Sequence, residues 1–146
     1  SLRLFSIYGP KQRPEFVIPA FIQLIKRKQK LTVYGDGSQI RAFCHVNDAC
    51  RAIISSLTIQ LPGQSQILNI GNDLEPITML SLAETLCNLS NISSSEFIRV
   101  IPLSDTLRGE HREIYYRNPC IEKAKSLLKY NPTIDLSSGL TKLLKS

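Results

Sequence analysis

The chain has 146 residues, of which 42% are hydrophobic and 21% charged, which suits one globular domain. No run approaches the roughly 18 uninterrupted apolar residues of a membrane span, and the beginning of the chain carries no signal-peptide pattern, so we expect a cytoplasmic protein without membrane contact. The net charge of +6 favours an anionic partner.

Hydrophobic periodicity predicts strands and helices in alternation along the chain. The expected strands cover residues 2–8, 31–34, 40–46, 67–70 and 97–101. The expected helices cover residues 17–28, a segment capped by Asn47 or Asp48, a segment capped by Thr78, a segment starting at Asn118-Pro119, and a last one from Leu136. This alternation is typical of the α/β class.

The stretch LTVYGDGSQIRAF, residues 31–43, predicts a hairpin that turns at Asp36-Gly37. Tyr34 and Arg41 would then lie across the hairpin and could point at one spot. An aromatic ring and a guanidinium group at one spot suit a nucleotide base and a phosphate. The alternative is structural, with Tyr34 in the core of the hairpin and Arg41 in a surface ion pair.

The residues alone give few signs of catalysis or of a metal site. There is no glycine-rich phosphate loop, no G-x-S-x-G motif and no Tyr-x-x-x-Lys pair. His45 is expected to be structural, and the spacing of Cys44, Cys50, Cys87 and Cys120 argues for reduced thiols rather than a metal site. On this basis the chain is an α/β domain that binds an anionic ligand.

A series of short motifs runs through nearly the whole chain. In order they are RLFSIYGP (3–10), QRP (12–14), IP (18–19), LTVYGDGS (31–38), RAF (41–43), VND (46–48), LNIG (68–71) and KAKSLL (123–128). Together they resemble the C-terminal half of the NAD-dependent epimerase/dehydratase family, which comprises the extended short-chain dehydrogenases that act on nucleotide sugars.

The resemblance implies a small mixed α/β substrate-binding subdomain of a Rossmann-type protein, without its dinucleotide-binding half. In the family the N-terminal half holds NAD and supplies the catalytic Ser or Thr, Tyr and Lys, and none of these motifs is present here. We therefore expect residues 1–146 to be the nucleotide-sugar-binding part, with residues 1–10 contributing a strand to the parent sheet. We expect no catalytic residue in this chain, no NAD bound by it alone, and a UDP-sugar as the ligand.

The resemblance also assigns substrate contacts to Ser6, Tyr34, Arg41, Asn69, Arg112 and Arg117. Tyr34 would pack near the base, whereas Arg41 and Arg112 would meet the diphosphate or ribose. Asn69 matches the Asn of the family's YNIG segment, and Arg117 resembles an Arg that reaches the sugar in the decarboxylase branch. Ser6 departs from the Asn that many members have there.

Three functions remain open from the sequence. The first is the substrate-binding part of a nucleotide-sugar epimerase, dehydratase or decarboxylase, inactive alone. The second is a stand-alone, non-catalytic binding or regulatory protein of the same fold. The third and least favoured is nucleic-acid binding through residues 26–30, which are more simply the basic end of a helix. An uncovered edge of the strand at 2–8 would also favour self-association.

Overall fold

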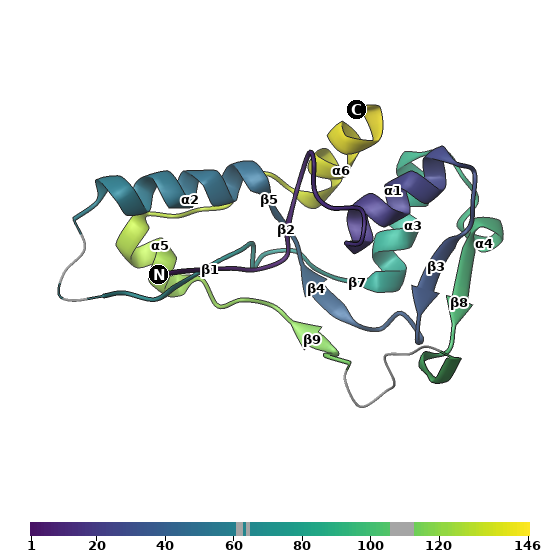
Figure 1. Cartoon of the computed structure of the whole chain (residues 1–146), viewed down its shortest axis with the longest axis horizontal. Helices are drawn as coiled ribbons and strands as arrows, with labels where there is room; N and C mark the ends of the chain where they lie inside the picture. The colour runs from purple at the N-terminus through teal and green to yellow at the C-terminus, as the bar shows by residue number, and fades with distance from the viewer. Residues whose placement is uncertain (61–62, 64, 106–112) are drawn as a thin grey trace.

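A computed structural model describes residues 1–60, 63, 65–105 and 113–146, and its strands and helices alternate as predicted (Figure 1). The strands are β1 (Leu2–Leu4), β2 (Ile7–Tyr8), β3 (Leu31–Tyr34), β4 (Ile40–Ala42), β5 (Cys44–His45), β6 (Leu68–Ile70), β7 (Pro76–Thr78), β8 (Ile98–Ile101) and β9 (Tyr116–Arg117). The helices are α1 (Val17–Lys26), α2 (Val46–Thr58), α3 (Met79–Leu89), α4 (Ser94–Phe97), α5 (Glu122–Leu128) and α6 (Leu136–Lys145), with a 3₁₀ turn at Leu103–Asp105.

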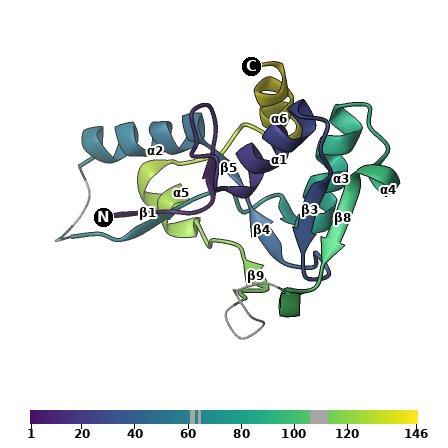
Figure 2. The same ribbon diagram turned by 45° about the vertical axis from the view of Figure 1, so that its right-hand side comes forward.

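The strands pair in small sheets along an elongated molecule (Figure 2). Three parallel pairs, β1 with β6, β2 with β5 and β3 with β8, account for most of the strands. The fourth sheet has the order β7-β4-β9, in which β4 runs antiparallel to β7 and parallel to β9. This sheet lies between the two ends of the molecule and brings residues 40–42 beside residues 116–117.

The predicted hairpin at residues 31–46 is wrong. A turn is present, since Gly35 and Gly37 have φ values of 72° and 76° and the Asp36 carboxylate accepts a hydrogen bond from the Ser38 amide at 2.9 Å. The chain does not fold back on itself after this turn, because β3 pairs with β8 while β4 pairs with β7 and β9. Partners far along the chain therefore compete successfully with the local pairing that the turn residues suggest.

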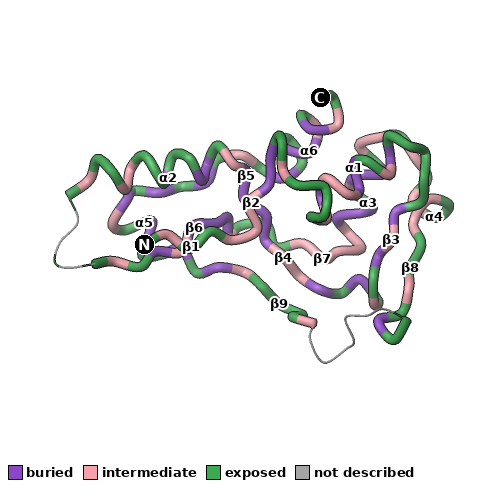
Figure 3. Tube along the Cα trace, in the orientation of Figure 1, coloured by how far each residue is buried: buried purple, intermediate pink, exposed green. Residues whose placement is uncertain are grey.

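Two clusters of buried apolar side chains stabilise the two ends of the molecule (Figure 3). In the first cluster, α1, α3 and α6 pack around β3; its members include Phe21, Leu31, Leu82, Leu86 and Leu140. In the second, α2 and α5 pack on β6; its members include Ala49, Ala52, Leu68, Ile70 and Leu128.

Some helix ends differ from the sequence prediction. Thr78 caps α3 as predicted, because its hydroxyl accepts a hydrogen bond from the Ser81 amide at 3.0 Å. His45 rather than Asn47 or Asp48 caps α2, with its Nδ1 accepting from the Asn47 amide at 3.2 Å. The helix expected from Asn118-Pro119 begins only at Glu122.

Tyr8 links the middle of the molecule to the last helix. Its side chain is 1% exposed and meets His45 edge to face, with ring centroids 5.3 Å apart. A Cβ atom built on Gly139 of α6 would lie only 2.0 Å from the Tyr8 hydroxyl oxygen. Glycine at position 139 therefore allows α6 to approach β2 and β5 closely.

We expect Gly139→Ala to destabilise the protein by about 1–3 kcal/mol, because the methyl group must displace a buried, rigid ring. Urea denaturation of the two proteins measures the difference. Tyr8→Phe is the matched control: it removes the hydroxyl oxygen that would clash and that has no hydrogen-bond partner among the described residues. If Gly139→Ala costs as much in the Tyr8→Phe background as in the wild type, the overlap with this hydroxyl is not the cause.

Candidate functional site

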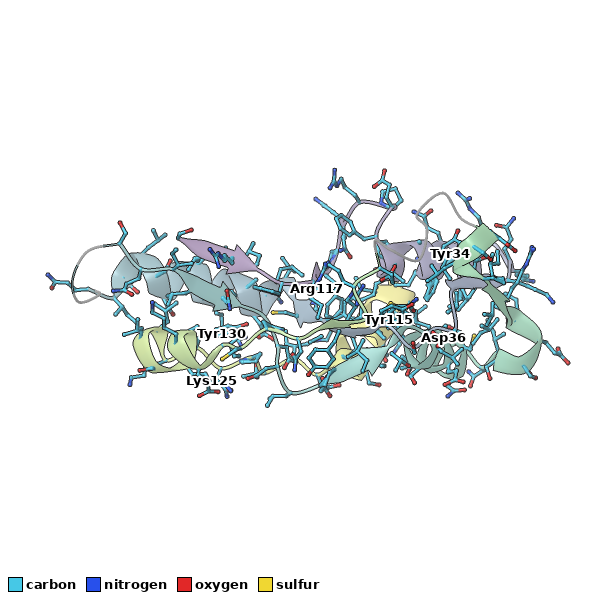
Figure 4. All side chains as sticks on the ribbon, turned by 90° about the horizontal axis from the view of Figure 1, so that it is seen from below. Tyr34, Asp36, Tyr115, Arg117, Lys125 and Tyr130 are labelled. Atoms are coloured by element: carbon cyan, nitrogen blue, oxygen red, sulfur yellow. The ribbon has the colours of Figure 1, made fainter. Side chains whose placement is uncertain are left out.

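Arg41 and Arg117 lie side by side although they are far apart in the sequence. β4 and β9 run parallel, and Arg41 is the register partner of Arg117. Register partners on neighbouring strands project from the same face of a sheet, with their Cβ atoms close together. Arg117 is exposed and occupies the middle of the molecule in Figure 4. The sheet therefore gathers two of the predicted substrate contacts on one face.

The guanidinium group of Arg41 is held by three acceptors. Its Nη1 donates to the carbonyl oxygens of Ile40 at 2.8 Å and Ile114 at 2.7 Å, and its Nη2 donates to Glu113 at 2.9 Å. The side chains of Arg41 and Glu113 are only 16% and 14% exposed. The ion pair that the sequence analysis gave as the alternative role of Arg41 is thus present, and it joins β4 to the segment that leads into β9.

Exposed aromatic side chains accompany the two arginines. Tyr115 and Tyr116, which the sequence analysis did not select, are 52% and 62% exposed and directly precede Arg117. Tyr34 is 49% exposed at the end of β3, in a different sheet from Arg41. Figure 4 shows Tyr115 close to Arg117 and Tyr34 farther along the same view. The adjacent YYR letters could have drawn attention to Tyr115 and Tyr116.

Asn69 and Ser6 lie in and after the parallel strands β6 and β1. The Asn69 amide nitrogen donates to the Cys120 carbonyl oxygen at 3.2 Å, so this contact ties β6 to the segment before α5. Ser6 separates β1 from β2 and has a positive φ of 43°. Its carbonyl oxygen accepts a hydrogen bond from the Cys44 amide at 3.2 Å. The single strand predicted for residues 2–8 is therefore broken at this bend.

We expect Ser6→Gly to stabilise the protein by several tenths of a kcal/mol, because glycine adopts a positive φ more readily than serine does. Thermal unfolding measures the change. Ser6→Ala serves as the control, because alanine removes the hydroxyl but keeps the Cβ atom that makes a positive φ unfavourable. A melting temperature for Ser6→Gly no higher than that of Ser6→Ala would show that the bend is not strained.

Arg112 lies outside the described residues. No group of three or more His, Cys, Asp or Glu side chains in the described ranges could hold a metal ion. None of the helices in those ranges is both long and apolar enough to cross a membrane. All four cysteines are free thiols.

The titratable groups near the middle of the molecule are suited to structure rather than to proton transfer. Burial raises the pKa of the Cys44 thiol to about 11, and the hydrogen bond between this thiol and the Tyr130 hydroxyl only partly offsets this. Burial also lowers the pKa of His45, whose Nδ1 accepts the hydrogen bond that caps α2. We call the side of the sheet that carries Arg41, Arg117 and Tyr115 the arginine face; its exposed groups are the Arg117 cation and the Tyr115 phenol ring, which can bind an anion and a planar ring.

Two shallow hollows lie away from the arginine face. One, of about 360 Å³, is lined by residues of α1 and α6 and by the segment after β2, including Lys11 and Lys26. The other, of about 270 Å³, lies between the ends of α1, α3 and α6. Neither of these two hollows contains Arg41, Arg117 or Asn69.

Comparison with known proteins shows which family this chain resembles. Residues 1–71 match the NAD dependent epimerase/dehydratase family. UDP-N-acetyl-alpha-D-glucosaminuronate decarboxylase of Bacillus cytotoxicus is 32% identical over 99% of this chain and 44% of its own length. dTDP-D-glucose 4,6-dehydratase of Mus musculus is 38% identical over 98% of this chain and 39% of its own. The chain thus spans less than half the length of these relatives.

Solved structures agree with this result. UDP-glucuronic acid 4-epimerase from Bacillus cereus, in complex with UDP-glucuronic acid and NAD, matches with a TM-score of 0.85 and 29% identity, over 99% of this chain and 44% of that protein. The dTDP-glucose 4,6-dehydratase DesIV from Streptomyces venezuelae, with NAD bound, matches with a TM-score of 0.84 and 26% identity, over 99% of this chain and 42% of that protein. The mixed α/β fold predicted from the sequence is confirmed, and so is the predicted resemblance to the C-terminal half of the NAD-dependent epimerase/dehydratase family.

Proposed function

We propose that this chain is the nucleotide-sugar-binding part of an NAD-dependent epimerase, dehydratase or decarboxylase. It binds the diphosphate and base of a UDP-sugar and holds the sugar for chemistry that needs NAD. The hydride and proton transfers are carried out by groups that this chain does not contain, so the chain alone is inactive. Its own contribution is to position the substrate and to neutralise the charge of the diphosphate.

The observation that carries this proposal is the pairing of Arg41 with Arg117 in the sheet. A diphosphate has two phosphate groups, and guanidinium groups bind phosphate oxygens through forked hydrogen bonds. Two guanidinium groups on one face, with the exposed Tyr115 phenol ring beside Arg117, can bind phosphate oxygens and stack on a base. Asn69 and Ser6 are proposed to contact the sugar side of the ligand, and Tyr34 the base; Arg112 joins this set from the sequence alone.

The free edge of β1 supports the proposal that a further part of the protein packs against this chain. Within the described residues β1 pairs with β6 alone, and its Leu4 is 52% exposed. On α2, Ile54 and Leu57 are 61% and 81% exposed. Apolar side chains beside an unpaired strand edge favour association with another sheet or chain. We propose that residues 1–10 extend a larger sheet that holds NAD.

We expect this chain to bind UDP weakly and to show no tight binding of NAD. UDP supplies the diphosphate and the base that the arginine face meets, whereas a glycine-rich loop that could cradle a dinucleotide is missing from the sequence. Calorimetric titrations with UDP and with NAD test both expectations. Micromolar binding of NAD would contradict the assignment of this chain to substrate binding.

A nucleic-acid-binding role predicts a different result when the chain is titrated with UDP and with DNA. Binding through residues 26–30 would give affinity for DNA that falls steeply with salt and no saturable UDP site. DNA binding with that salt dependence, and without UDP binding, would therefore replace the proposed function.

A further inference from the structure

Glu113 occupies the part of Arg41 that a phosphate would need. Its carboxylate accepts a hydrogen bond from Nη2 of Arg41 at 2.9 Å, and the two side chains are largely shielded from solvent. A carboxylate and a phosphate present the same kind of acceptor to a guanidinium group. The two therefore compete for one donor edge, and the sequence motifs did not point to Glu113.

Arg41 does not depend on Glu113 for its place. The other nitrogen, Nη1, donates to the carbonyl oxygens of Ile40 and Ile114, and both of these belong to the backbone of the chain. These two bonds hold the guanidinium group in plane while Nη2 exchanges its partner. Glu113 can leave without releasing Arg41 from the sheet.

We propose that Glu113 is an affinity-determining and specificity-determining residue, an internal competitor that a diphosphate must displace from Arg41. This inference rests on the proposed function of the arginine face. In the absence of ligand, Glu113 neutralises Arg41 beside the cation of Arg117. A ligand gains from Arg41 only if its anionic oxygens bind the guanidinium group better than one carboxylate does. Weak or singly charged anions are excluded in this way.

The test is the dissociation constant of UDP, measured by calorimetry on the whole chain for the wild type and four variants. Glu113→Gln keeps the shape and one acceptor oxygen of the side chain but removes its charge, so we expect UDP to bind about fivefold more tightly. Glu122→Gln is the matched control, since Glu122 is also ion-paired, at 2.9 Å to Lys125 on α5, but belongs to another part of the fold. It removes the same charge and should leave the affinity nearly unchanged.

Arg41→Gln, alone and combined with Glu113→Gln, completes a double-mutant cycle for the Arg41–Glu113 pair. The gain from Glu113→Gln should vanish when Arg41 is absent, because the competition is for Arg41 alone. Equal gains from Glu113→Gln and Glu122→Gln would overturn the inference and leave only an effect of net charge. Weaker UDP binding by Glu113→Gln would also overturn it and make Glu113 a residue that positions Arg41. UDP binding that is absent, or that is insensitive to Arg41→Gln, would overturn the proposed function and this inference with it.

Discussion

Replacing Asp48 with alanine is expected to lower the free energy of unfolding by about 3 kcal/mol. The Asp48 side chain is fully buried in the first turn of α2. Its carboxylate accepts hydrogen bonds from the backbone amides of Thr133 and Ile134, at 3.3 and 3.2 Å, and pairs with Arg51. The loss leaves two backbone N–H groups without their acceptor and detaches the segment that leads into α6.

Urea denaturation of Asp48→Ala and of two controls measures this effect. Thr133→Val removes the hydroxyl that contacts the same carboxylate and accepts from Arg51, but it keeps the Thr133 backbone amide, and Arg51→Ala removes a cation that is about half exposed. Each control should cost about 1 kcal/mol or less, because the backbone bonds remain. A cost for Asp48→Ala no larger than these controls would show that the two amides find other acceptors.

Replacing Arg41 with alanine is expected to weaken UDP binding by about tenfold to a hundredfold. A charged hydrogen bond contributes roughly 1.5–3 kcal/mol, and each 1.4 kcal/mol is a factor of ten in affinity. Because Arg41 also bridges β4 to Ile114, the variant should lose some stability as well. Arg41→Lys should recover only part of the affinity, since an ammonium group cannot make the forked contact.

Arg117→Ala separates binding from stability in this second prediction. Arg117 is exposed, so its loss should weaken UDP binding while leaving the melting temperature nearly unchanged. Calorimetry and thermal unfolding on the same samples give both quantities. One result would contradict this prediction: both variants keep the wild-type affinity for UDP, and Arg41→Ala only lowers stability. Arg41 would then be a structural residue and Arg117 a surface residue without a role in binding.

The sequence predicts the elements of this fold better than their partners. The helix cap at Thr78 is readable because a short hydroxyl side chain before a helical pattern satisfies the first amides. The pairing of β3 with β8 is not readable, because the turn at Asp36-Gly37 is equally compatible with a local hairpin. Long-range pairing depends on the burial of both strands, which local propensity does not encode.

The candidate site shows the same limit. Arg41 could be selected from its motif, and Arg117 from its place before Asn-Pro, but their register in one sheet depends on where β9 docks. Glu113 could not be selected, because a single acidic residue in a polar stretch gives no sign of its partner. Its role becomes visible only when the Arg41 guanidinium group is seen between Glu113 and two backbone carbonyls.

The proposal that the arginine face binds the diphosphate is tested most directly by a nuclear magnetic resonance titration. The labelled chain is titrated with UDP, and the Nε–H signals of its arginines are followed. We expect the signals of Arg41 and Arg117 to shift and saturate together, with the same dissociation constant, while Arg27, in the basic run after α1, does not respond. Shifts confined to Arg27 and its neighbours, or no saturable shift at Arg41 and Arg117, would contradict the proposal.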